Sequence, residues 1–483
     1  MEETKHMEPD KSTLEEPLAV EMKEVPPGSA AVVDVAPPAD ASAPLTSEGA
    51  RVAAPAGGEE PHPPHYEGKK ATARITVLNM MCNVIGGGVL ALPTAFHDSS
   101  LVVGLILLPL TAMFTIGNLY FIVECAEATQ IFDYRKLLFR GLGPYGSRVV
   151  DFALFVFPFG ALCAYAVVIA DSMPPVMQHF LHASGFWLNR ICWLLIGGVV
   201  FFALSCRRSL SELKVSSFFG LLTIFYAVFV VMFRFFDGTY SPGGHQAAHV
   251  APGLDPAYLK GTMFKTIPVM VFSFSVHNNA PTYYQELEGR RPAKMYRVIG
   301  ISHAIIITTY ALMAVFGLLT FGPAIATKAE GNILHAYAKS DVLMNTARLG
   351  MFIHFACVYP ILQMAARRGF NNFVFRTNDL PMWKLCVESF FIVVASCVLA
   401  GLVPNIDTIL SINGALFGSL IVMMAPSALF LFIDPWEGRD GRSLRRGLAI
   451  ASIVFGFVVG VLGLWATISD VVNKKPVSPE GAE

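Results

Sequence analysis

The sequence predicts an all-α integral membrane protein with eleven transmembrane helices, of which the first and the sixth are broken. The 483 residues are 54% hydrophobic and only 15% charged, whereas a soluble domain has about 25% charged residues. Eleven apolar segments reach the length needed to cross a bilayer, roughly 20 residues at a rise of about 1.5 Å each. The first and sixth segments also contain residues that interrupt helices at membrane depth.

The eleven segments follow one another along most of the chain. They lie near residues 75–96, 101–125, 149–172, 190–206, 213–236, 263–283, 296–321, 342–364, 383–403, 406–433 and 447–470. The fourth segment is the shortest of them. We therefore expect an eleven-span domain over residues 69–472, preceded by a tail over residues 1–68 and followed by a short C-terminal tail over residues 473–483.

The N-terminal tail differs from the rest of the chain in composition. It holds 14 acidic and 4 basic residues and 11 of the chain's 31 prolines. The stretch EVPPGSAAVVDVAPPADASAP has too few periodic apolar residues to bury a core, so we expect residues 1–68 to be disordered and cytosolic. The tail acts either as a solvated extension or in trafficking and regulation.

The charge of the connections predicts the orientation of the chain. Basic residues gather in the cytosolic connections of membrane proteins. With the tail taken as cytosolic, the stretch KKATAR and the cytosolic connections carry 22 Lys and Arg residues, and the connections of the other side with the C-terminus carry 9. This alternation predicts an N-terminus in the cytosol and a C-terminus outside.

Several function classes have no motif in the chain. None of the eight cysteines has the spacing of zinc ligands, and no Walker loop, zinc-protease helix or nucleophile elbow occurs. We therefore expect no enzyme activity, no metal site, no cofactor and no nucleic-acid partner. Membrane lipid is the expected surrounding of the apolar segments.

The first apolar segment contains three consecutive glycines in the stretch NVIGGGVLALP. Each interior glycine weakens a helix by roughly 0.8–1 kcal/mol relative to alanine, and Pro93 follows shortly after. Backbone groups freed at membrane depth need protein or a water-filled cavity to satisfy them. A half-helix that begins at such a break presents unpaired N–H groups and a partial positive charge, which a carboxylate can approach. The alternative is close packing of helices through small residues.

The sixth apolar segment, TIPVMVFSFSVHNNAPTYYQELEGR, contains the second interruption. Pro268, the polar run over residues 277–279 and Pro281 all disfavour a continuous helix. Transporters built from two inverted halves place their broken helices in corresponding positions of the two halves. The paired breaks therefore predict a secondary active transporter that works by alternating access around a site at mid-membrane.

The quoted stretches resemble the amino acid/auxin permease family. LNMMCNVIGGGVLALPTAF is similar to that family's first helix, FSFSVHNNAPTYYQEL to its sixth, and RKLLFRGLGPYGSRVVDF to its connection between helices two and three. The resemblance covers residues from about 70 to 472, and the tail and loops most resemble the trypanosomatid branch. It implies a five-plus-five inverted repeat of the APC-superfamily type, an eleventh helix outside the repeat, and coupled uptake (symport) of amino acids or related amines.

The resemblance also implies a substrate-binding site at the two breaks. At the first break the substrate carboxylate is expected on backbone N–H groups, and the residues concerned are Asn83, Ile85, Gly86, Gly87 and Gly88. At the second break freed carbonyls and hydroxyls are expected to receive the α-ammonium, and the residues concerned are Ser273, Phe274 and Ser275. The Phe274 ring is expected to lie over the bound side chain as a gate. For each serine, a bond to the preceding helical turn is the alternative.

The remaining predictions concern the coupling ion, the substrate and the membrane. His277 and His354 are the deepest titratable groups, and because histidine titrates near neutral pH, either is a candidate for coupling. Since no acidic cation cage occurs in the sequence, we expect H⁺ to drive uptake, with Na⁺ as the alternative. The amino acid is neutral or cationic, and the plasma membrane is favoured over the lysosome or vacuole. The alternative functions are an amino-acid-sensing receptor or scaffold, and a permease for polyamines or related amines.

Overall fold

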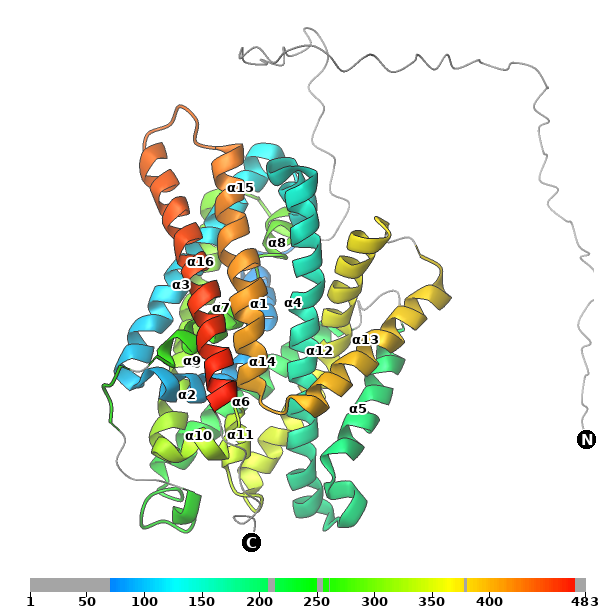
Figure 1. Cartoon of the computed structure of the whole chain (residues 1–483), viewed down its shortest axis with the longest axis vertical. Helices are drawn as coiled ribbons and strands as arrows, with labels where there is room; N and C mark the ends of the chain where they lie inside the picture. Colours follow the sequence, from blue (N-terminus) through cyan, green and yellow to red (C-terminus); the bar gives the residue numbers. More distant parts are fainter. Residues whose placement is uncertain (1–69, 207–212, 250–254, 260, 378–379, 474–483) are drawn as a thin grey trace, which may run out of the picture. The chain divides into compact units, whose positions relative to one another are not determined.

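A computed structural model of the chain describes residues 70–206, 213–249, 255–259, 261–377 and 380–473. These residues lie in one compact unit and are helical almost throughout (Figure 1). The all-α prediction is confirmed. The predicted disordered tail over residues 1–68 and the predicted C-terminal tail beyond Asn473 lie outside the described residues.

The predicted segments correspond to single helices or to helices in series. In chain order they are α1 (Ala73–Val84) with α2 (Gly88–Ser99), α3 (Leu101–Thr129), α4 (Tyr134–Leu181), α5 (Arg190–Ser205), α6 (Leu213–Phe236), α7 (Met263–Ser273) with α8 (Ala280–Glu286), α9 (Pro292–Phe321), α12 (Val342–Val374), α13 (Met382–Leu402), α14 (Ile406–Asn413) with the π-helix η4 (Gly414–Met424) and α15 (Ala425–Ile433), and α16 (Arg442–Asn473). The short helices of the connections are η1 (Gly185–Leu188), η2 (Ala247–His249), η3 (Gly322–Ala324), α10 (Ile325–Lys328) and α11 (Ile333–Ala336).

Most of these segments are long enough to span a membrane. Among the described residues, eight helical segments are long and apolar enough to do so, and the bent pair of α1 and α2 makes a ninth. The apolar helices α5 and α7 are shorter, with 16 and 11 residues. Because the fourth segment is short and the sixth is divided by its break, the count of eleven stays a prediction.

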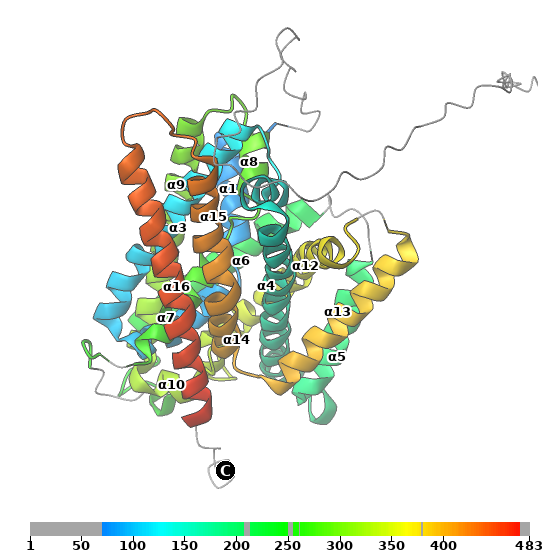
Figure 2. The ribbon, with the colours of Figure 1, turned by 45° about the horizontal axis from the view of Figure 1, so that its top comes forward.

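Two groups of helices make up most of the core. In the first group α1, α2, α3, α7, α8 and α9 pack on one another, and in the second group α4, α5, α12 and α13 do so. Figure 2 shows the second group, in which α5 and α13 lie beside α4 and α12. α6 contacts both groups through α9 and α12, while α14, η4 and α16 pack against α7. Both broken segments therefore belong to the first group.

The connection before the third predicted segment is helical, which hydropathy did not indicate. α4 begins at Tyr134 and not near residue 149, and its helix is interrupted at Gly143, where φ is 69° and ψ is −173°. Glycine adopts this conformation without the steric cost that a Cβ brings. Gly143 thus separates a helical connection, which carries charged residues, from the part of α4 that crosses the membrane.

The two ends of the helical unit are fixed by different contacts. At one end, the Ala71 N–H donates to the Glu286 carbonyl at 2.8 Å and the Glu288 N–H donates to the Ala71 carbonyl at 2.9 Å, which forms a parallel bridge. At the other end, Asp470 near the end of α16 lies 3.0 Å from Lys265 at the start of α7. We call these the Ala71 end and the Lys265 end. The described chain therefore starts at one end and finishes at the other, as an odd number of crossings requires.

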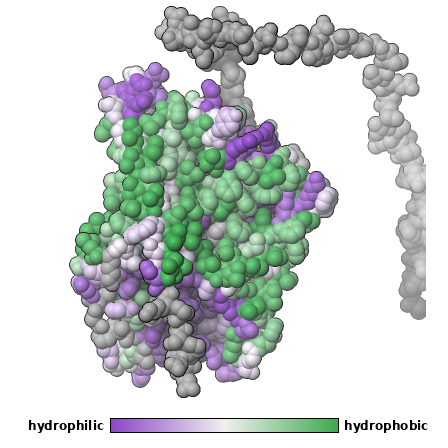
Figure 3. Space-filling model, in the orientation of Figure 1, coloured by the Kyte–Doolittle hydropathy of each residue, from purple (hydrophilic) through white to green (hydrophobic). Residues whose placement is uncertain are grey.

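Apolar side chains are exposed between the two ends. On α16, Val454, Phe457, Val461 and Trp465 are each more than half exposed. Figure 3 shows this face, with hydrophobic residues over α15 and α16 and hydrophilic residues toward the ends. A soluble protein rarely exposes so large an apolar surface, so the surface agrees with the membrane-spanning prediction.

Candidate functional site

The first break is a three-residue interruption between α1 and α2. α1 ends at Val84 and α2 begins at Gly88, and the two helices are bent by 60° relative to each other. Within the described backbone, no carbonyl accepts a hydrogen bond from the N–H groups of Gly86, Gly87 or Gly88. The break thus leaves donors at the start of α2, as its sequence predicts.

The second break lies between α7 and α8. α7 ends at Ser273 and α8 begins at Ala280, and the intervening residues 274–279 turn without forming a regular helix. Pro281 occupies the first turn of α8, where its missing N–H costs no helical hydrogen bond. The breaks therefore occur in the first and sixth segments, where the sequence predicts them.

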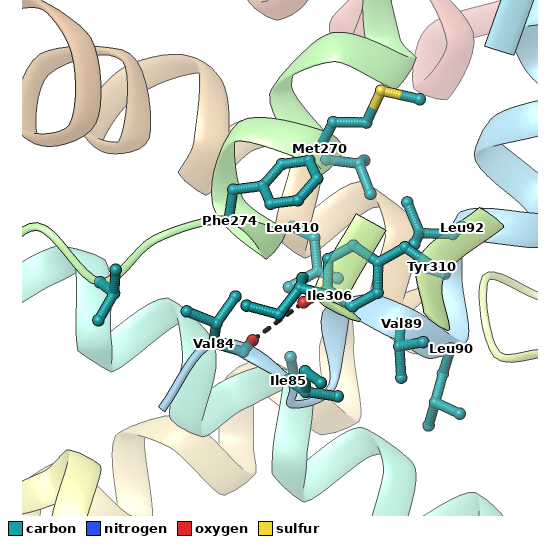
Figure 4. Close-up of a cluster of buried hydrophobic side chains, with 14 of the residues drawn as sticks. Val84, Ile85, Val89, Leu90, Leu92, Met270, Phe274, Ile306, Tyr310 and Leu410 are labelled. Carbon is teal, nitrogen blue, oxygen red and sulfur yellow. Dashed lines mark hydrogen bonds between the residues drawn. The ribbon is translucent and has the colours of Figure 1, made fainter. Parts of the chain in front are cut away.

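A single buried tyrosine connects the two breaks. The Tyr310 hydroxyl, from α9, lies 3.0 Å from the Val84 carbonyl and 2.7 Å from the Ser273 carbonyl and donates to both. Figure 4 shows Tyr310 among the apolar side chains around the first break, with its bond to Val84 dashed. These two carbonyls are the last of α1 and of α7, which a helix end leaves without a partner. Tyr310 thus fixes the distance between the breaks.

A cavity of about 190 Å³ lies between the breaks and the second group of helices. This volume is below the range of about 300–1,000 Å³ typical of drug-sized ligand sites, so the cavity suits a small solute. Its lining residues come from both breaks, α4, α12 and η4, and they are Asn83, Val84, Gly86, Gly87, Gly88, Leu154, Phe157, Pro158, Ala161, Tyr165, Phe272, Ser273, Ser275, Asn278, Asn279, Ile361, Leu362, Met364, Ala365, Arg368 and Ile421.

Six of the eight predicted substrate residues line this cavity. They are Asn83, Gly86, Gly87, Gly88, Ser273 and Ser275. The remaining two, Ile85 and Phe274, are absent from the lining and are buried elsewhere, with exposed fractions of 1% and 0%. The structure therefore brings most of the predicted set together around one space.

Phe274 lies outside the lining of this cavity. Its ring packs against Tyr310, with ring centroids 5.3 Å apart, and lies parallel to His303 at 6.3 Å. Phe272, two residues earlier on α7, does line the cavity, together with Phe157 and Tyr165, and its ring centroid lies 5.1 Å from that of Phe157. The two phenylalanines differ because residues two apart on a helical turn point in nearly opposite directions. The gating role of Phe274 stays a prediction.

The glycines of the first break are also closely packed. A Cβ built on Gly88 would lie 2.3 Å from the Ser273 hydroxyl, and one on Gly86 would lie 2.7 Å from the Tyr165 hydroxyl. At Gly87 the Cβ would lie 3.1 Å from the Tyr165 ring. The close-packing alternative therefore applies to these glycines, since Gly88 allows α2 to approach α7 and Gly86 and Gly87 leave room for Tyr165. Binding of a substrate carboxylate by their N–H groups stays a prediction.

Ser273 has its hydrogen-bonding groups engaged within the protein. Its hydroxyl donates to the Val269 carbonyl at 2.7 Å, one turn back along α7. Its own carbonyl accepts the bond from Tyr310. The alternative of a serine bonded to its preceding turn therefore applies to Ser273, and an ammonium group would share its carbonyl with Tyr310.

The two candidate coupling histidines lie outside the cavity lining. His277 is fully buried, and its Nε2 lies 3.0 Å from the Thr115 carbonyl oxygen. His354 is 3% exposed and packs against Gly220 of α6, with neither ring nitrogen hydrogen bonded among the described residues. Each lies on an element that contributes to the cavity, but neither contacts its interior.

The cavity contains residues that the sequence prediction did not include. Tyr165 lies in a long apolar segment with no local sign of function, so only the fold reveals it. Asn278 and Asn279 belong to the polar run that indicated the second break, and they were available from the same signal. Arg368 is the only charged residue among the lining residues described. In the sequence it belongs to a basic connection that was used to predict the orientation of the chain in the membrane, and not to predict a binding site.

The fold is shared with solved transporter structures. A mutant of the manganese transporter of Eremococcus coleocola matches with a TM-score of 0.55 and 11% identity, over 84% of this chain and 89% of that one. The structure of MhsT in complex with L-phenylalanine matches with a TM-score of 0.51 and 14% identity, over 83% of this chain and 99% of that one. Both have the LeuT fold with its broken helices, which confirms the predicted fold class.

Similar sequences include transporters from yeasts and a plant. The chain is 26% identical to vacuolar amino acid transporter 5 of Schizosaccharomyces pombe, over 80% of this chain and 92% of that one. It is 26% identical to amino acid transporter AVT6E of Arabidopsis thaliana, over 82% and 83%, and 23% identical to vacuolar amino acid transporter 2 of Saccharomyces cerevisiae, over 84% and 85%. The predicted trypanosomatid branch stays a prediction.

A protein-family model matches nearly the whole of the helical unit. The model described as "Transmembrane amino acid transporter protein" matches residues 69–469. This range contains both breaks, Tyr310 and every residue that lines the cavity. The chain therefore belongs to the family of transmembrane amino acid transporters, the amino acid/auxin permeases.

Proposed function

We propose that this chain moves neutral amino acids across a membrane by alternating access, driven by a proton gradient. The observation that carries the proposal is the cavity between two broken segments. Among its lining residues, Asn83 and Arg368 are exposed, and Arg368 lies near the end of α12 that is remote from the Lys265 end. We infer that the cavity opens toward this end, as one state of an alternating-access cycle requires.

The lining supports a neutral substrate. No Asp or Glu occurs among the lining residues described, and a cationic side chain in a desolvated site needs a carboxylate partner. Apolar side chains from α4 and α12 face the breaks, among them Leu154, Phe157 and Ile361. An amino acid with its carboxylate toward the glycines would direct its side chain toward this apolar wall. Arginine, lysine and polyamines would place a charge there.

Uptake into vesicles that contain the purified full chain tests this proposal. Labelled L-alanine, L-leucine and L-phenylalanine should accumulate against a gradient, whereas L-arginine and putrescine should not. Accumulation of arginine or putrescine would contradict the substrate class. Specific binding without accumulation of any compound would favour the alternative of a receptor or scaffold.

A proton as coupling ion is supported by the titratable groups close to the breaks. His277 lies within the second break, and no carboxylate that would bind Na⁺ lines the described cavity. Collapsing the pH gradient with an ionophore should abolish accumulation, and replacing Na⁺ should leave it intact. The opposite pair of results would assign coupling to Na⁺. If His277 is the relay, His277→Gln should exchange substrate without accumulating it.

The relatives bear on the membrane in which the chain works. Two of them are named as vacuolar amino acid transporters, which supports the membrane of an internal compartment and not the plasma membrane favoured by the sequence. We propose that location, with the N-terminus cytosolic and the C-terminus on the other side. Fluorescent tagging of the full chain in its native cell distinguishes the two locations, and a pH-sensitive tag at the C-terminus reports its side.

A further inference from the structure

A second cavity, of about 310 Å³, lies between the beginning of α4 and the end of α12, in the upper part of Figure 1. It shares no described lining residue with the cavity at the breaks. The segment that leads into α4 contacts α8, where the Thr282 hydroxyl lies 3.5 Å from the Phe132 carbonyl oxygen. The second cavity therefore belongs to the Ala71 end, which we propose to face the cytosol. We call it the α4–α12 pocket.

Arginines supply most of the charge in this pocket. Arg135, Arg148 and Arg376 line it, and Asp151 is the one acidic residue among the described lining residues. The Arg135 guanidinium lies 2.6 Å from the carboxylate of Asp151, whose side chain is 4% exposed, so these two charges balance each other. Within the described part of the chain, Arg148 and Arg376 have no ion pair. The pocket thus keeps two positive charges that its described lining does not balance.

The size and the polar groups of the pocket suit a phosphorylated headgroup. A guanidinium binds phosphate oxygens through two parallel hydrogen bonds. A phosphate monoester carries a charge of about −1.5 to −2 at neutral pH, which matches the charge of Arg148 and Arg376 together. The hydroxyl-bearing residues Tyr145 and Ser147 also line the pocket. Its volume lies at the lower end of the range of about 300–1,000 Å³ that is typical of ligand sites.

The surface around the pocket favours a lipid over a soluble phosphate compound. Three of the lining residues, Phe139, Tyr145 and Phe373, are exposed to the surroundings, and tyrosine is enriched at the level of lipid headgroups. Farther along α4, beyond its kink, Val149 and Phe152 are exposed, and the Phe152 ring contacts that of Phe373 at 5.5 Å. An acyl chain attached to a headgroup in the pocket would pack on these apolar side chains, whereas a soluble compound would leave them uncovered.

We propose that the α4–α12 pocket binds an anionic phospholipid whose headgroup carries a phosphate monoester. Arg148 and Arg376 hold the phosphate, and the acyl chains lie along the exposed apolar side of α4. Anionic lipids are concentrated in the cytosolic leaflet, and basic pockets between membrane helices bind their headgroups. The inference goes beyond the proposed transport function, since it depends on neither the substrate nor the coupling ion. The bound headgroup links α4 to α12, which together form the apolar wall that faces the two breaks.

Binding of a short-chain lipid to the purified full chain in detergent tests the pocket. The probe is dioctanoyl phosphatidylinositol 4-phosphate, and microscale thermophoresis measures its Kd. We expect saturable binding that also raises the melting temperature of the chain, because a ligand that binds only the folded state stabilises it. Dioctanoyl phosphatidylcholine, which has no net charge, should bind at least tenfold more weakly. Equal binding of the two lipids, or no binding of the first, would overturn the inference.

Two variants and a matched control locate the binding. Arg148→Ala and Arg376→Ala should each raise the Kd about fivefold, since one basic residue near a membrane surface contributes about that much. Both side chains are exposed and they belong to different parts of the fold, so either variant tests the pocket if the other is not stable. The control is Arg140→Ala, which removes an exposed arginine of the same stretch of α4 outside the described lining. An equal loss in Arg140→Ala would mean that surface charge in general attracts the lipid, and the pocket assignment would be wrong.

The soluble headgroup distinguishes a lipid site from a phosphate site. Inositol 1,4-bisphosphate has the same phosphate groups without acyl chains. It should bind about tenfold or more weakly than the dioctanoyl lipid, because burial of apolar surface contributes to binding of the lipid alone. Equal affinity would assign the pocket to a soluble phosphate compound and refute the lipid. None of these measurements requires transport, so they stand whether or not the chain accumulates amino acids.

Discussion

Replacement of Tyr310 by phenylalanine isolates the contact that joins the two breaks. The change removes one hydroxyl and keeps the ring, which is fully buried and packs against Phe274. The hydroxyl donates to the Val84 carbonyl at 3.0 Å and to the Ser273 carbonyl at 2.7 Å. Without it, the last carbonyls of α1 and α7 both lose this partner.

The expected cost follows from those two contacts. A buried acceptor left without its hydrogen bond costs about 1–3 kcal/mol. Because a hydroxyl has one proton to share, we expect one such penalty for Tyr310→Phe and not two. If about 1.4 kcal/mol of it falls on the arrangement that binds substrate, affinity drops about tenfold. The loss should be in binding, because the hydroxyl positions the breaks and does not line the cavity.

Tyr359→Phe provides the matched control. Tyr359 of α12 is equally buried, and its hydroxyl is hydrogen bonded to the Ser396 hydroxyl at 2.6 Å, within the second group of helices. Both variants should melt at lower temperature than wild type in detergent. Only Tyr310→Phe should lose affinity for the best-accepted neutral amino acid in a scintillation-proximity binding assay. Equal affinity of Tyr310→Phe and wild type would refute the positioning role.

Three further predictions concern the carboxylate site, the tail and a surface ion pair. If the N–H groups of Gly86 and Gly87 hold the substrate carboxylate, the methyl ester of the preferred amino acid should compete for binding about ten- to a hundredfold less well than the free acid. The reason is that a charge-assisted hydrogen bond contributes roughly 1.5–3 kcal/mol. An ester that competes as well as the free acid contradicts the assignment. Deletion of residues 1–68, which we propose lie outside the transport domain, should leave the KM for uptake unchanged in vesicles, and a large rise in KM would place part of the site in the tail. The hydrogen bond from Arg442 at 2.8 Å, with a second from Arg446 at 2.7 Å, holds the pKa of Asp434 below its usual value. Asp434→Asn should therefore lower the melting temperature at pH 7. A carboxyl with a depressed pKa stabilises the fold only while it is ionised, so the difference in melting temperature between the variant and wild type should shrink as pH falls below about 4. A difference that does not vary with pH argues against the ion pair.

Local chemistry made the breaks predictable. Consecutive glycines weaken a helix by themselves, without any contact to a distant segment, and so does the polar run that ends at Pro281. The structure interrupts the helices at both places, between α1 and α2 and between α7 and α8. Six of the eight predicted residues line one cavity for the same reason, because residues at a break lie at the surface that the break creates.

Contacts between distant segments were not predictable in this way. Tyr310 and Val84 are 226 positions apart, and no local pattern marks either as a partner of the other. Lys265 and Asp407 each read as a charged residue at the end of an apolar segment, where solvent usually reaches, and only the packing of α7 on α14 brings them together. The choice between Phe272 and Phe274 depended on the rotation of α7, which a hydrophobic run on all faces does not define.

The bridge at Ala71 affects how the accessible side of the cavity can close. Its two hydrogen bonds join main-chain atoms of Ala71, before α1, to the last residue of α8, Glu286, and to Glu288 just after it. Side-chain replacements at Ala71 or Leu287 therefore leave the connection in place, and only a proline at residue 71 or 288 would remove a donor. Because these main-chain bonds link the start of α1 to the end of α8, we expect the two half-helices to move together. A substrate that contacts either break would then displace both.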